Sequence, residues 1–368
     1  MRGRALTAPY RVTIVRTQRR PRNGPSHLEY LVVDAAAADP RPKPVSLDHL
    51  LKLAAADMAG VDSLIRDRMQ SPVSVIPALA EHLIGGSAKR LRPLLTVAAA
   101  RLAGSVEDHC QKLAAAVEFI HTATLLHDDV VDSSELRRGK VAAHLIWGAP
   151  SSVLVGDFLF ARAFELMVET GSMSALEILA RASRVIAEGE VLQLTRAHDL
   201  DLDEAVYLQI IKAKTAELFA AAAEAGGVCA GASPERAAAL RRYGQDLGLA
   251  FQLVDDALDY SGASETLGKN PGDDFREGKA TLPLILAIHR TGAQERDFWM
   301  RTVDAREQTE ADFERARTLV QDSGALEVTL ESAAGYAQSA KAALSVFPAN
   351  DWRAAMEDLA DFAVARRS

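Results

Sequence analysis

Apolar residues recur every three to four positions along most of the chain from residue 46 onward. This spacing places them on one face of an α-helix, and runs of β-branched residues are few. Helices are therefore predicted to begin near Ser46, after Ser74, near Val106, after Ser172, near Leu202 and after Ser233. A further apolar helical segment is predicted over residues 144–170, and amphipathic helices are predicted over residues 280–367.

Glycine and proline mark the ends of several of these helices. Gly85-Gly86 follows the apolar stretch 75–84, and glycine commonly ends a helix because it adopts a left-handed backbone without strain. Ser233-Pro234 provides the serine cap and the first-turn proline that are typical of a helix start. By the same reasoning, the helix that begins near Leu202 is predicted to break at Gly226-Gly227.

Composition supports an all-α protein and excludes some functions. Hydrophobic residues fill 48% of the 368 positions, aromatic residues only 5%, and alanine and leucine are abundant. A net charge of −8 and a pI near 5.7 argue against nucleic-acid binding. No apolar run reaches the length of a membrane span, and no secretory signal is present. Cys110 and Cys229 both stand in apolar helical stretches, where an unpaired cysteine is usually a small buried side chain. Unpaired cysteines are typical of a reducing compartment, so we expect a cytoplasmic protein.

The first 44 residues differ from the rest of the chain. Seven arginines precede the first acidic residue, and proline and alanine dominate the later part. This composition predicts a basic, poorly ordered extension over residues 1–44, followed by a single all-α domain over residues 45–368. A transit peptide, which is also rich in arginine and poor in acidic residues, and an over-extended start are both left open.

An acidic motif occurs twice, each time after an apolar helical run. The first copy is Asp128-Asp129-Val130-Val131-Asp132, and the second is Asp255-Asp256-Ala257-Leu258-Asp259. Helix positions four apart share a face, so the first and last aspartates of each copy are expected to point the same way. One copy alone would fit a solvated helix surface, but two copies, each followed by basic residues, favour a pair of binding sites.

The clustered carboxylates predict a metal site. They repel one another and are costly to remove from water, and a divalent cation removes that cost. Mg²⁺ takes oxygen ligands and is often held by one or two carboxylates together with substrate phosphates. We therefore expect the two motifs to hold a phosphate-bearing ligand through bridging Mg²⁺ ions.

Basic residues near the acidic motifs suit phosphate groups. The segment Gly85–Pro93 places Lys89, Arg90 and Arg92 at a helix start, where cations oppose the helix dipole and therefore indicate an anion site. Taken alone, the segment also fits a surface turn, and a helical histidine also fits ordinary packing. The further basic candidates are His121, Arg137, Arg138, Lys214 and Lys269.

Together these features resemble the trans-isoprenyl diphosphate synthases, also called polyprenyl synthetases. Five separated motifs occur in the order of that family, and the resemblance covers most of residues 46–300. Besides the two acidic motifs, Gly85–Pro93 resembles its GGxxKRxRP segment, Lys214-Thr215 its KT pair and Gly278–Pro283 its GKxTLP segment. The insertion of Ser87-Ala88 is similar to the long-chain branch, which includes octaprenyl and decaprenyl diphosphate synthases.

The resemblance implies an isoprenoid synthase fold, a helical bundle around a deep central cavity, and a homodimer. It implies a prenyltransferase that uses three Mg²⁺ ions to condense isopentenyl diphosphate with farnesyl or geranyl diphosphate. The implied metal ligands are Asp128, Asp132 and Asp255. The implied contacts for isopentenyl diphosphate are Lys89, Arg92, His121 and Arg138, and those for the allylic diphosphate are Arg137, Lys214, Thr215, Gln252 and Lys269. With the metal ligands, Asp129, Asp256 and Lys214 form the set of candidate catalytic residues.

The small residues just before the first acidic motif bear on how long a product the enzyme can make. Ala123 and Thr124 lie five and four positions before Asp128, where bulky aromatic residues stop chain growth in short-chain relatives. The resemblance therefore implies an octaprenyl to decaprenyl product for quinone side chains, which is greasy enough for a transient membrane contact on release. Later candidates for the cavity floor are Phe119, Ile120, Phe164 and Met167, each of which also fits an ordinary core position.

Three other functions fit the sequence less well. A short-chain synthase would make farnesyl or geranylgeranyl diphosphate, and Ala123 and Thr124 count more strongly against the farnesyl product. A non-catalytic subunit of a heteromeric synthase should lack intact acidic motifs, whereas both are present. A terpene cyclase would not need Lys89, Arg92 and the second complete acidic motif.

Overall fold

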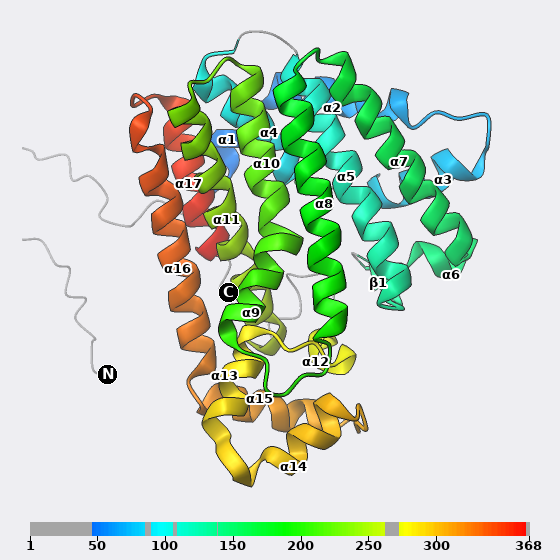
Figure 1. Ribbon diagram of the computed structural model, residues 1–368, viewed down its shortest axis with the longest axis vertical. Coiled ribbons are helices and arrows are strands. Elements are labelled where there is room, and N and C mark those ends of the chain that lie inside the picture. The colour runs from blue at the N-terminus through cyan, green and yellow to red at the C-terminus, as the bar shows by residue number, and fades with distance from the viewer. Residues whose placement is uncertain (1–45, 85–89, 106–108, 138, 262–271, 366–368) are drawn as a thin grey trace, which may run out of the picture. The chain divides into compact units, whose positions relative to one another are not determined.

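The computed structural model describes residues 46–84, 90–105, 109–137, 139–261 and 272–365. In these ranges the chain is helical apart from one short β-hairpin (Figure 1), which confirms the predicted all-α fold. The predicted division at residues 44 and 45 stays a prediction, because residues 1–45 lie outside the described ranges. None of the described helices is both long enough and apolar enough to cross a membrane.

The first half of the structure leads to the first acidic motif and the two long helices after it. Its elements are α1 (Asp48–Leu53), α2 (Ala55–Arg68), α3 (Val75–Ile84), α4 (Leu91–Ala103), α5 (His109–Val131), the hairpin β1 (Leu136–Arg137) and β2 (Lys140–Val141), α6 (Ala143–Trp147), α7 (Ala149–Glu169) and α8 (Met173–Thr195). Helix α8 begins near Ser172 as predicted, and the Ser172 hydroxyl caps it by accepting a hydrogen bond from the backbone N–H of Ala175 at 3.2 Å.

The second half carries the second acidic motif. Its elements are α9 (Glu204–Ile211), the π-helical turn η1 (Lys212–Ala216), α10 (Glu217–Cys229), α11 (Pro234–Ser261), α12 (Asp273–Glu277), α13 (Leu282–Thr291), the 3₁₀ turn η2 (Gly292–Gln294), α14 (Arg296–Trp299), the π-helical turn η3 (Met300–Asp304), α15 (Asp312–Asp322), α16 (Ala325–Ala343), the 3₁₀ turn η4 (Leu344–Val346) and α17 (Asp351–Ala365). Residues 280–365 are thus mainly helical, as predicted.

Helix α10 occupies the centre of the bundle, in contact with α4, α5, α8 and α11 (Figure 1). The predicted break at Gly226-Gly227 is wrong, because α10 continues to Cys229. These glycines are needed for packing: an added Cβ would lie 2.3 Å from the Thr96 carbonyl oxygen at Gly226, and 2.3 Å from a Leu240 methyl group at Gly227. They therefore bring α10 close to α4 and α11 and do not end the helix.

The apolar segment predicted over residues 144–170 forms two helices. Gly148 separates α6 from α7 with φ 85° and ψ 150°, a conformation that residues with a side chain rarely adopt. Helix α7 then packs along α5 (Figure 1). This pairing supports the end of α5, where the first acidic motif lies.

The helices α12–α15 gather near the lower ends of α8 and α9 in Figure 1. They enclose a separate apolar cluster that includes Tyr260 at the end of α11, Phe275 of α12 and Trp299 of α14. The segment after the second acidic motif is therefore anchored by its own buried core.

Candidate active site

The first acidic motif closes α5 and faces two lysines from distant parts of the chain. The Lys214 ammonium lies 3.8 Å from a carboxylate oxygen of Asp128. The Lys279 ammonium lies 2.7 Å from a carboxylate oxygen of Asp132. Both aspartates belong to the same helix face, as their spacing of four predicted, and their side chains stay partly exposed, at 16% and 17%.

Burial and the lysines set the charge of this cluster. Burial raises the pKa of Asp128, against the opposing effect of the Lys214 ammonium. Burial would also raise the pKa of Asp132, but Lys279, together with Lys214 and Arg137, outweighs this effect, so that the pKa of Asp132 is lowered. Glu190 of α8 joins the cluster at 2.7 Å from Lys214, and burial raises the pKa of its carboxyl group as well. The site thus concentrates carboxylates and ammonium groups in a poorly solvated region.

The middle aspartate of the first motif turns into the protein. Asp129 is fully buried, and its Oδ1 accepts a hydrogen bond of 2.8 Å from Nε of Arg137 and a second one from Nη2. Arg137 lies in β1, so this ion pair joins the hairpin to the end of α5. Asp129 is therefore paired with Arg137, whereas Asp128 and Asp132 face lysines.

The π-helical turn η1 places two adjacent residues toward the two motifs. Lys214 reaches Asp128, whereas the Thr215 hydroxyl donates to Oε1 of Gln252 in α11 at 2.8 Å. A π-turn carries one more residue than an α-turn and is frequent at functional sites. Gly189 lets α8 approach this turn, because an added Cβ would lie 2.7 Å from Cβ of Ala213.

The first two aspartates of the second motif differ in burial. Asp256 is 2% exposed, and it accepts hydrogen bonds from Nε2 of Gln252 at 2.8 Å and from the hydroxyl of Tyr207. Burial raises the pKa of Asp256 to about 7. Asp255 is less deeply buried than Asp256. Of the two, Asp255 is therefore the better placed to meet a ligand.

The last aspartate of the second motif supports the following helix. Asp259 is 7% exposed, and its two carboxylate oxygens accept hydrogen bonds from the backbone N–H groups of Gly272 at 3.0 Å and Asp274 at 3.3 Å. These contacts fix the start of α12, which precedes Lys279. Asp259 thus differs from its counterpart in the first motif, Asp132, which faces a lysine.

Some of the remaining predicted residues lie in the described part of the chain, and others lie outside it. Arg92 lies 3.2 Å from the His121 ring and over the ring of Phe219, so the expected pair of basic residues is brought together. Ala123 is fully buried, and Thr124 donates to the carbonyl oxygen of His121 at 2.8 Å. Three predicted contact residues lie outside the described residues: Lys89, Arg138 and Lys269.

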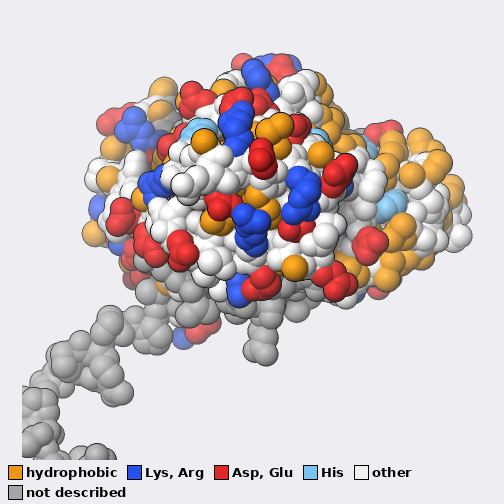
Figure 2. Space-filling view, turned by 90° about the horizontal axis from the view of Figure 1, so that it is seen from below, with side chains coloured by type: hydrophobic (Ala, Val, Ile, Leu, Met, Phe, Trp, Pro, Cys, Tyr) orange, Lys and Arg blue, Asp and Glu red, His pale blue; other side chains and the backbone are white. Residues whose placement is uncertain are grey.

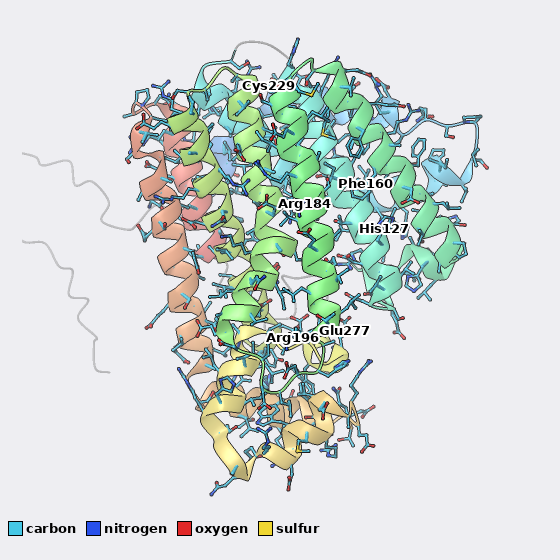
Figure 3. The ribbon with its side chains drawn as sticks, viewed as in Figure 1. His127, Phe160, Arg184, Arg196, Cys229 and Glu277 are labelled. Atoms are coloured by element: carbon cyan, nitrogen blue, oxygen red, sulfur yellow. The ribbon has the colours of Figure 1, made fainter. Side chains whose placement is uncertain are left out.

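A neighbouring histidine fixes the end of α5 against α7. His127 lies beside Phe160 of α7 (Figure 3), with ring centroids 6.1 Å apart, and its Nε2 is 3.1 Å from the Val153 carbonyl oxygen. An added Cβ at Gly156 would lie 2.2 Å from this Nε2, so the glycine makes room for the imidazole. His127 therefore helps to hold the end of α5 against α7.

Three site residues were not assigned from the sequence. Glu190 and Lys279 pair with residues of the first cluster, and Tyr207 donates to Asp256. Lys279 stands in the recognised Gly278–Pro283 segment, which could have indicated it. Glu190 and Tyr207 lie in ordinary amphipathic helices, where periodicity alone gives no such signal.

The donor set fits Mg²⁺ that is shared with a phosphate ligand. Within the described part of the chain, no three His, Cys, Asp or Glu side chains gather closely enough to hold a metal ion by themselves. Asp128, Asp132 and Asp255 nevertheless offer carboxylate oxygens, which Mg²⁺ prefers, and Mg²⁺ commonly completes its shell with substrate phosphates and water. The residues are therefore compatible with a metal that arrives with its substrate.

Known proteins resemble this chain in sequence and in fold. The polyprenyl synthetase family model matches residues 73–320. Octaprenyl diphosphate synthase of Escherichia coli K12 is 46% identical over 322 residues, which cover 88% of this chain and 99% of that protein.

Two solved structures extend the similarity. A polyprenyl synthase from Caulobacter crescentus CB15, complexed with calcium and isoprenyl diphosphate, is 74% identical with a TM-score of 0.86, over 89% of this chain and all of that one. A decaprenyl diphosphate synthase from Rhodobacter capsulatus is 51% identical with a TM-score of 0.84, over 88% of this chain and all of that one. Sequence, helical bundle and acidic motifs therefore agree that the chain belongs to the polyprenyl synthetase family.

Proposed function

We propose that this chain is an Mg²⁺-dependent prenyltransferase that condenses isopentenyl diphosphate head-to-tail with an allylic diphosphate. Its product is a long-chain, all-trans polyprenyl diphosphate. Family membership and the similarity to an octaprenyl and a decaprenyl diphosphate synthase support this function. The observation that carries it is the position of η1, where Lys214 faces the first acidic motif and Thr215 contacts Gln252 beside the second.

Three Mg²⁺ ions per site are proposed, with Asp128, Asp132 and Asp255 as protein ligands. When bound, the metal would supply positive charge that stabilises the pyrophosphate as it departs. Asp129 and Asp256 stay predicted catalytic residues, but their burial and hydrogen bonds favour a supporting role.

The diphosphate contacts are proposed from the basic residues around the motifs. Arg92 and His121, which lie together, are assigned to isopentenyl diphosphate along with Lys89 and Arg138. The residues assigned to the allylic diphosphate are Arg137, Lys214, Thr215, Gln252 and Lys269. To these we add Lys279, because its ammonium lies in the same cluster as Lys214.

The condensation requires that the negative charge on the departing pyrophosphate be stabilised and that water be kept away from the carbocation. Lys214 and Lys279 would stabilise negative charge on pyrophosphate as the allylic C–O bond breaks. The double bond of isopentenyl diphosphate then attacks the allylic carbocation, and transfer of a proton to the departed pyrophosphate restores a double bond. Apolar side chains exclude water, which would otherwise trap the carbocation. The fully buried Phe219 and Ala123 belong to this apolar interior.

Product length is proposed to depend on the wall of α5. Ala123 and Thr124 present small side chains before Asp128, which supports a product of octaprenyl to decaprenyl length for quinone side chains. Phe119, Ile120 and Met167 are buried in the main core, whereas Phe164 is 42% exposed. Phe164 is therefore a poor candidate for an internal floor. A cytoplasmic location and a transient membrane contact on product release stay predictions.

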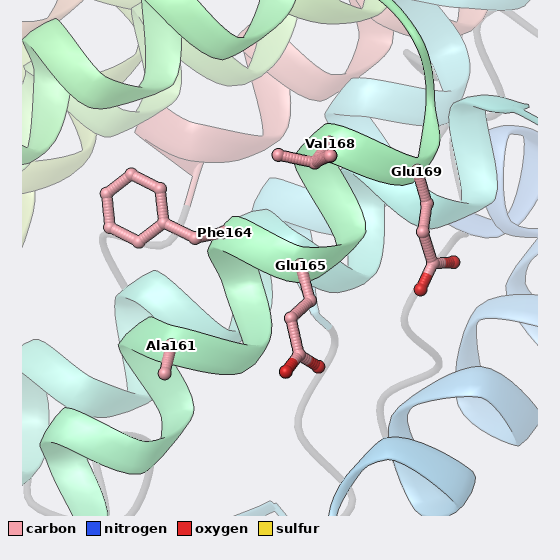
Figure 4. A pocket seen from close by; sticks show the side chains of 5 residues that line it. All are labelled: Ala161, Phe164, Glu165, Val168 and Glu169. Carbon is pink, nitrogen blue, oxygen red and sulfur yellow. The ribbon is translucent and has the colours of Figure 1, made fainter.

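A homodimer is proposed through an apolar face that we define by Leu154, Ala161, Phe164 and Val168 of α7. Its members recur at helical spacing, and Leu154 and Val168 are 66% and 65% exposed. Figure 4 shows Phe164 and Val168 directed away from Glu165 and Glu169. Orange side chains also gather at the right edge of Figure 2, and exposed apolar residues of α6 include Leu145 and Ile146.

The charges next to this α7 face are already paired within the chain. Glu169 binds Arg68 at 2.6 Å, and Glu165 binds Arg162 at 2.7 Å. An apolar face with neutralised borders suits an identical face, because a two-fold dimer brings the same surface patch together from both subunits. A second copy of this chain is therefore the proposed partner.

Product analysis tests the proposed function. The purified full-length protein is incubated with Mg²⁺, labelled isopentenyl diphosphate and farnesyl diphosphate, and the dephosphorylated products are separated by length. We expect a ladder that ends at octaprenyl to decaprenyl products. Products that stop at geranylgeranyl length would indicate a short-chain synthase, and no incorporation with any allylic primer would indicate a non-catalytic subunit.

A matched pair of variants links the activity to the site. Asp128→Asn removes the charge of a proposed metal ligand, and we expect it to abolish incorporation. Asp358→Asn removes a half-exposed charge on α17 and should leave incorporation unchanged. Equal activity in both variants would contradict the assignment of the site.

A further inference from the structure

A chain of hydrogen bonds joins three elements behind the second acidic motif. Thr215 of η1 donates to Oε1 of Gln252 at 2.8 Å, and Nε2 of Gln252 donates to Oδ1 of Asp256 at 2.8 Å. The hydroxyl of Tyr207, from α9, donates to Oδ2 of the same carboxylate. Tyr207 is 3% exposed and Asp256 is 2% exposed, so these contacts are shielded from water.

This arrangement determines which end of the Gln252 amide faces Asp256 and which end faces Thr215. One oxygen of Asp256 accepts from the Tyr207 hydroxyl and the other accepts from Nε2 of Gln252, so the NH₂ end of the amide faces the carboxyl group. The Thr215 hydroxyl donates to the oxygen end. A flipped amide would place Oε1 against Oδ1 of Asp256 and lose the hydrogen bond between these two residues. The amide is therefore held in one orientation.

The orientation of Asp256 depends in turn on Tyr207. A buried carboxylate needs hydrogen bonds to both oxygens, because leaving a buried polar atom without a partner is costly. Gln252 serves one oxygen and Tyr207 serves the other. Removing only the Tyr207 hydroxyl would leave the carboxylate with weaker support and allow it to turn.

We propose that Tyr207 is a positioning residue for the allylic diphosphate. Its hydroxyl holds Asp256, Asp256 holds the amide of Gln252, and Gln252 keeps its second N–H for an oxygen of the diphosphate. This inference rests on the proposed function, in which Gln252 contacts the allylic substrate. It adds a residue on α9 that contacts neither metal nor substrate but determines how well one substrate binds.

A matched tyrosine separates positioning from stability. Tyr243 of α11 is also fully buried, and its hydroxyl donates to the Met356 carbonyl oxygen at 2.6 Å. Tyr207→Phe and Tyr243→Phe each remove one buried hydroxyl and keep the ring. Both should lower the melting temperature, but only Tyr207→Phe should affect substrate binding.

Steady-state kinetics of the full-length protein with Mg²⁺, farnesyl diphosphate and isopentenyl diphosphate test the proposal. Loss of one buried hydrogen bond predicts that Tyr207→Phe raises the KM for farnesyl diphosphate about fivefold. The KM for isopentenyl diphosphate should not change, and kcat should change less than the KM for farnesyl diphosphate. Asp256→Asn should cause the same selective rise, because an asparagine no longer selects one end of the Gln252 amide.

A double-mutant cycle tests whether Tyr207 acts through Gln252. Gln252→Leu should itself raise the KM for farnesyl diphosphate, and adding Tyr207→Phe to it should then cause no further rise. An additive effect, or a lower melting temperature with unchanged KM, would overturn the proposed role of Tyr207. An inactive wild-type protein would instead contradict the proposed function, so the two failures are distinguishable.

Discussion

At the scale of single residues, each aspartate of the acidic motifs has a distinct environment. Asp128 and Asp132 face lysines, whereas Asp129 and Asp256 are buried against Arg137 and Tyr207. A repeated sequence pattern thus produces two kinds of carboxylate. The accessible kind can serve ligands, and the buried kind supports the residues around it.

The size of residue 123 should affect product length. Ala123 is fully buried in α5, five residues before Asp128. Ala123→Tyr places a large ring in the proposed path of the growing chain, so we expect products several prenyl units shorter. Product separation checks this, with Ala343→Tyr at the end of α16 as the control, which should leave the ladder unchanged. An unchanged ladder in Ala123→Tyr would remove this residue from the proposed wall.

Asp312 should make stability depend on pH. Hydrogen bonds from Arg301, at 2.9 and 2.7 Å, hold the pKa of Asp312 well below its usual value. A lowered native pKa stabilises the fold above the unfolded pKa of about 4, and this contribution disappears as pH falls. Asp312→Asn should therefore destabilise the protein near neutral pH and progressively less below about pH 4.

Urea unfolding of wild type and Asp312→Asn over this pH range checks the prediction. Asp297→Asn, which removes an exposed carboxylate in α14, is the control. A stability difference between wild type and Asp312→Asn that stays constant down to the lowest pH would contradict the role given to ionised Asp312.

At the scale of elements, the π-helical turn η1 connects the two acidic motifs. It follows α9 without a break, and it lies against both α8 and α11. An added Cβ at Gly248 of α11 would lie 2.6 Å from Cα of Ala216, and Gly189 of α8 is equally close to the turn. Glycines on both neighbours therefore determine the position of Lys214 and Thr215.

Gly189→Ala should disturb this turn. The new methyl group would lie 2.7 Å from Cβ of Ala213 and 3.0 Å from the backbone nitrogen of Lys214, so α8 and η1 must separate. Such overpacking typically costs about 1–3 kcal/mol. We expect a lower melting temperature and a fall in kcat/KM, because Lys214 moves with the turn.

Gly335→Ala is the matched control for this substitution. Gly335 lies inside α16, and apart from its chain neighbours and the nearby backbone of its own helix no atom lies within 4 Å of an added Cβ. Replacing glycine by alanine in an exposed helix should stabilise it by up to about 1 kcal/mol. We expect a raised melting temperature and unchanged activity. A Gly189→Ala variant that behaved like this control would show that α8 and η1 tolerate the extra methyl group.

At the scale of the whole molecule, the helix pair α5 and α7 connects the candidate active site with the proposed dimer interface. The central helix α10 extends η1 into the core, and α5 and α7 pack together beside it. The α7 face with Leu154 and Phe164 lies on the other side of the same helix pair. Dimer formation would therefore cover the helix that supports the end of α5.

Phe164→Glu should weaken the proposed dimer. It places a charge in the centre of the apolar α7 face, where a partner subunit would have to bury it. Analytical ultracentrifugation should show a dimer for wild type and a shift toward monomer for Phe164→Glu. Val346→Glu changes a 39% exposed side chain away from this face and should remain dimeric. A monomeric wild type, or an unaffected Phe164→Glu, would contradict the proposed interface.

The sequence alone determined the helices and the two motif positions. Helical periodicity, the cap at Ser233 and the spacing of the aspartates are local, so they can be recognised without knowing distant neighbours. The same local rules misjudged Gly226-Gly227, because a glycine pair can end a helix or admit a close neighbour. Which of the two occurs depends on Thr96 and Leu240, residues that local rules do not include.

Only the tertiary structure decided which partner each site residue has. Lys279 meets Asp132 from 147 positions away, and Tyr207 meets Asp256 from 49 positions away. Such contacts are set by how helices pack, and side-chain periodicity within one helix carries no information about the facing helix. The chemistry of the motifs is therefore readable in the sequence, whereas the division into accessible and buried carboxylates is a property of the fold.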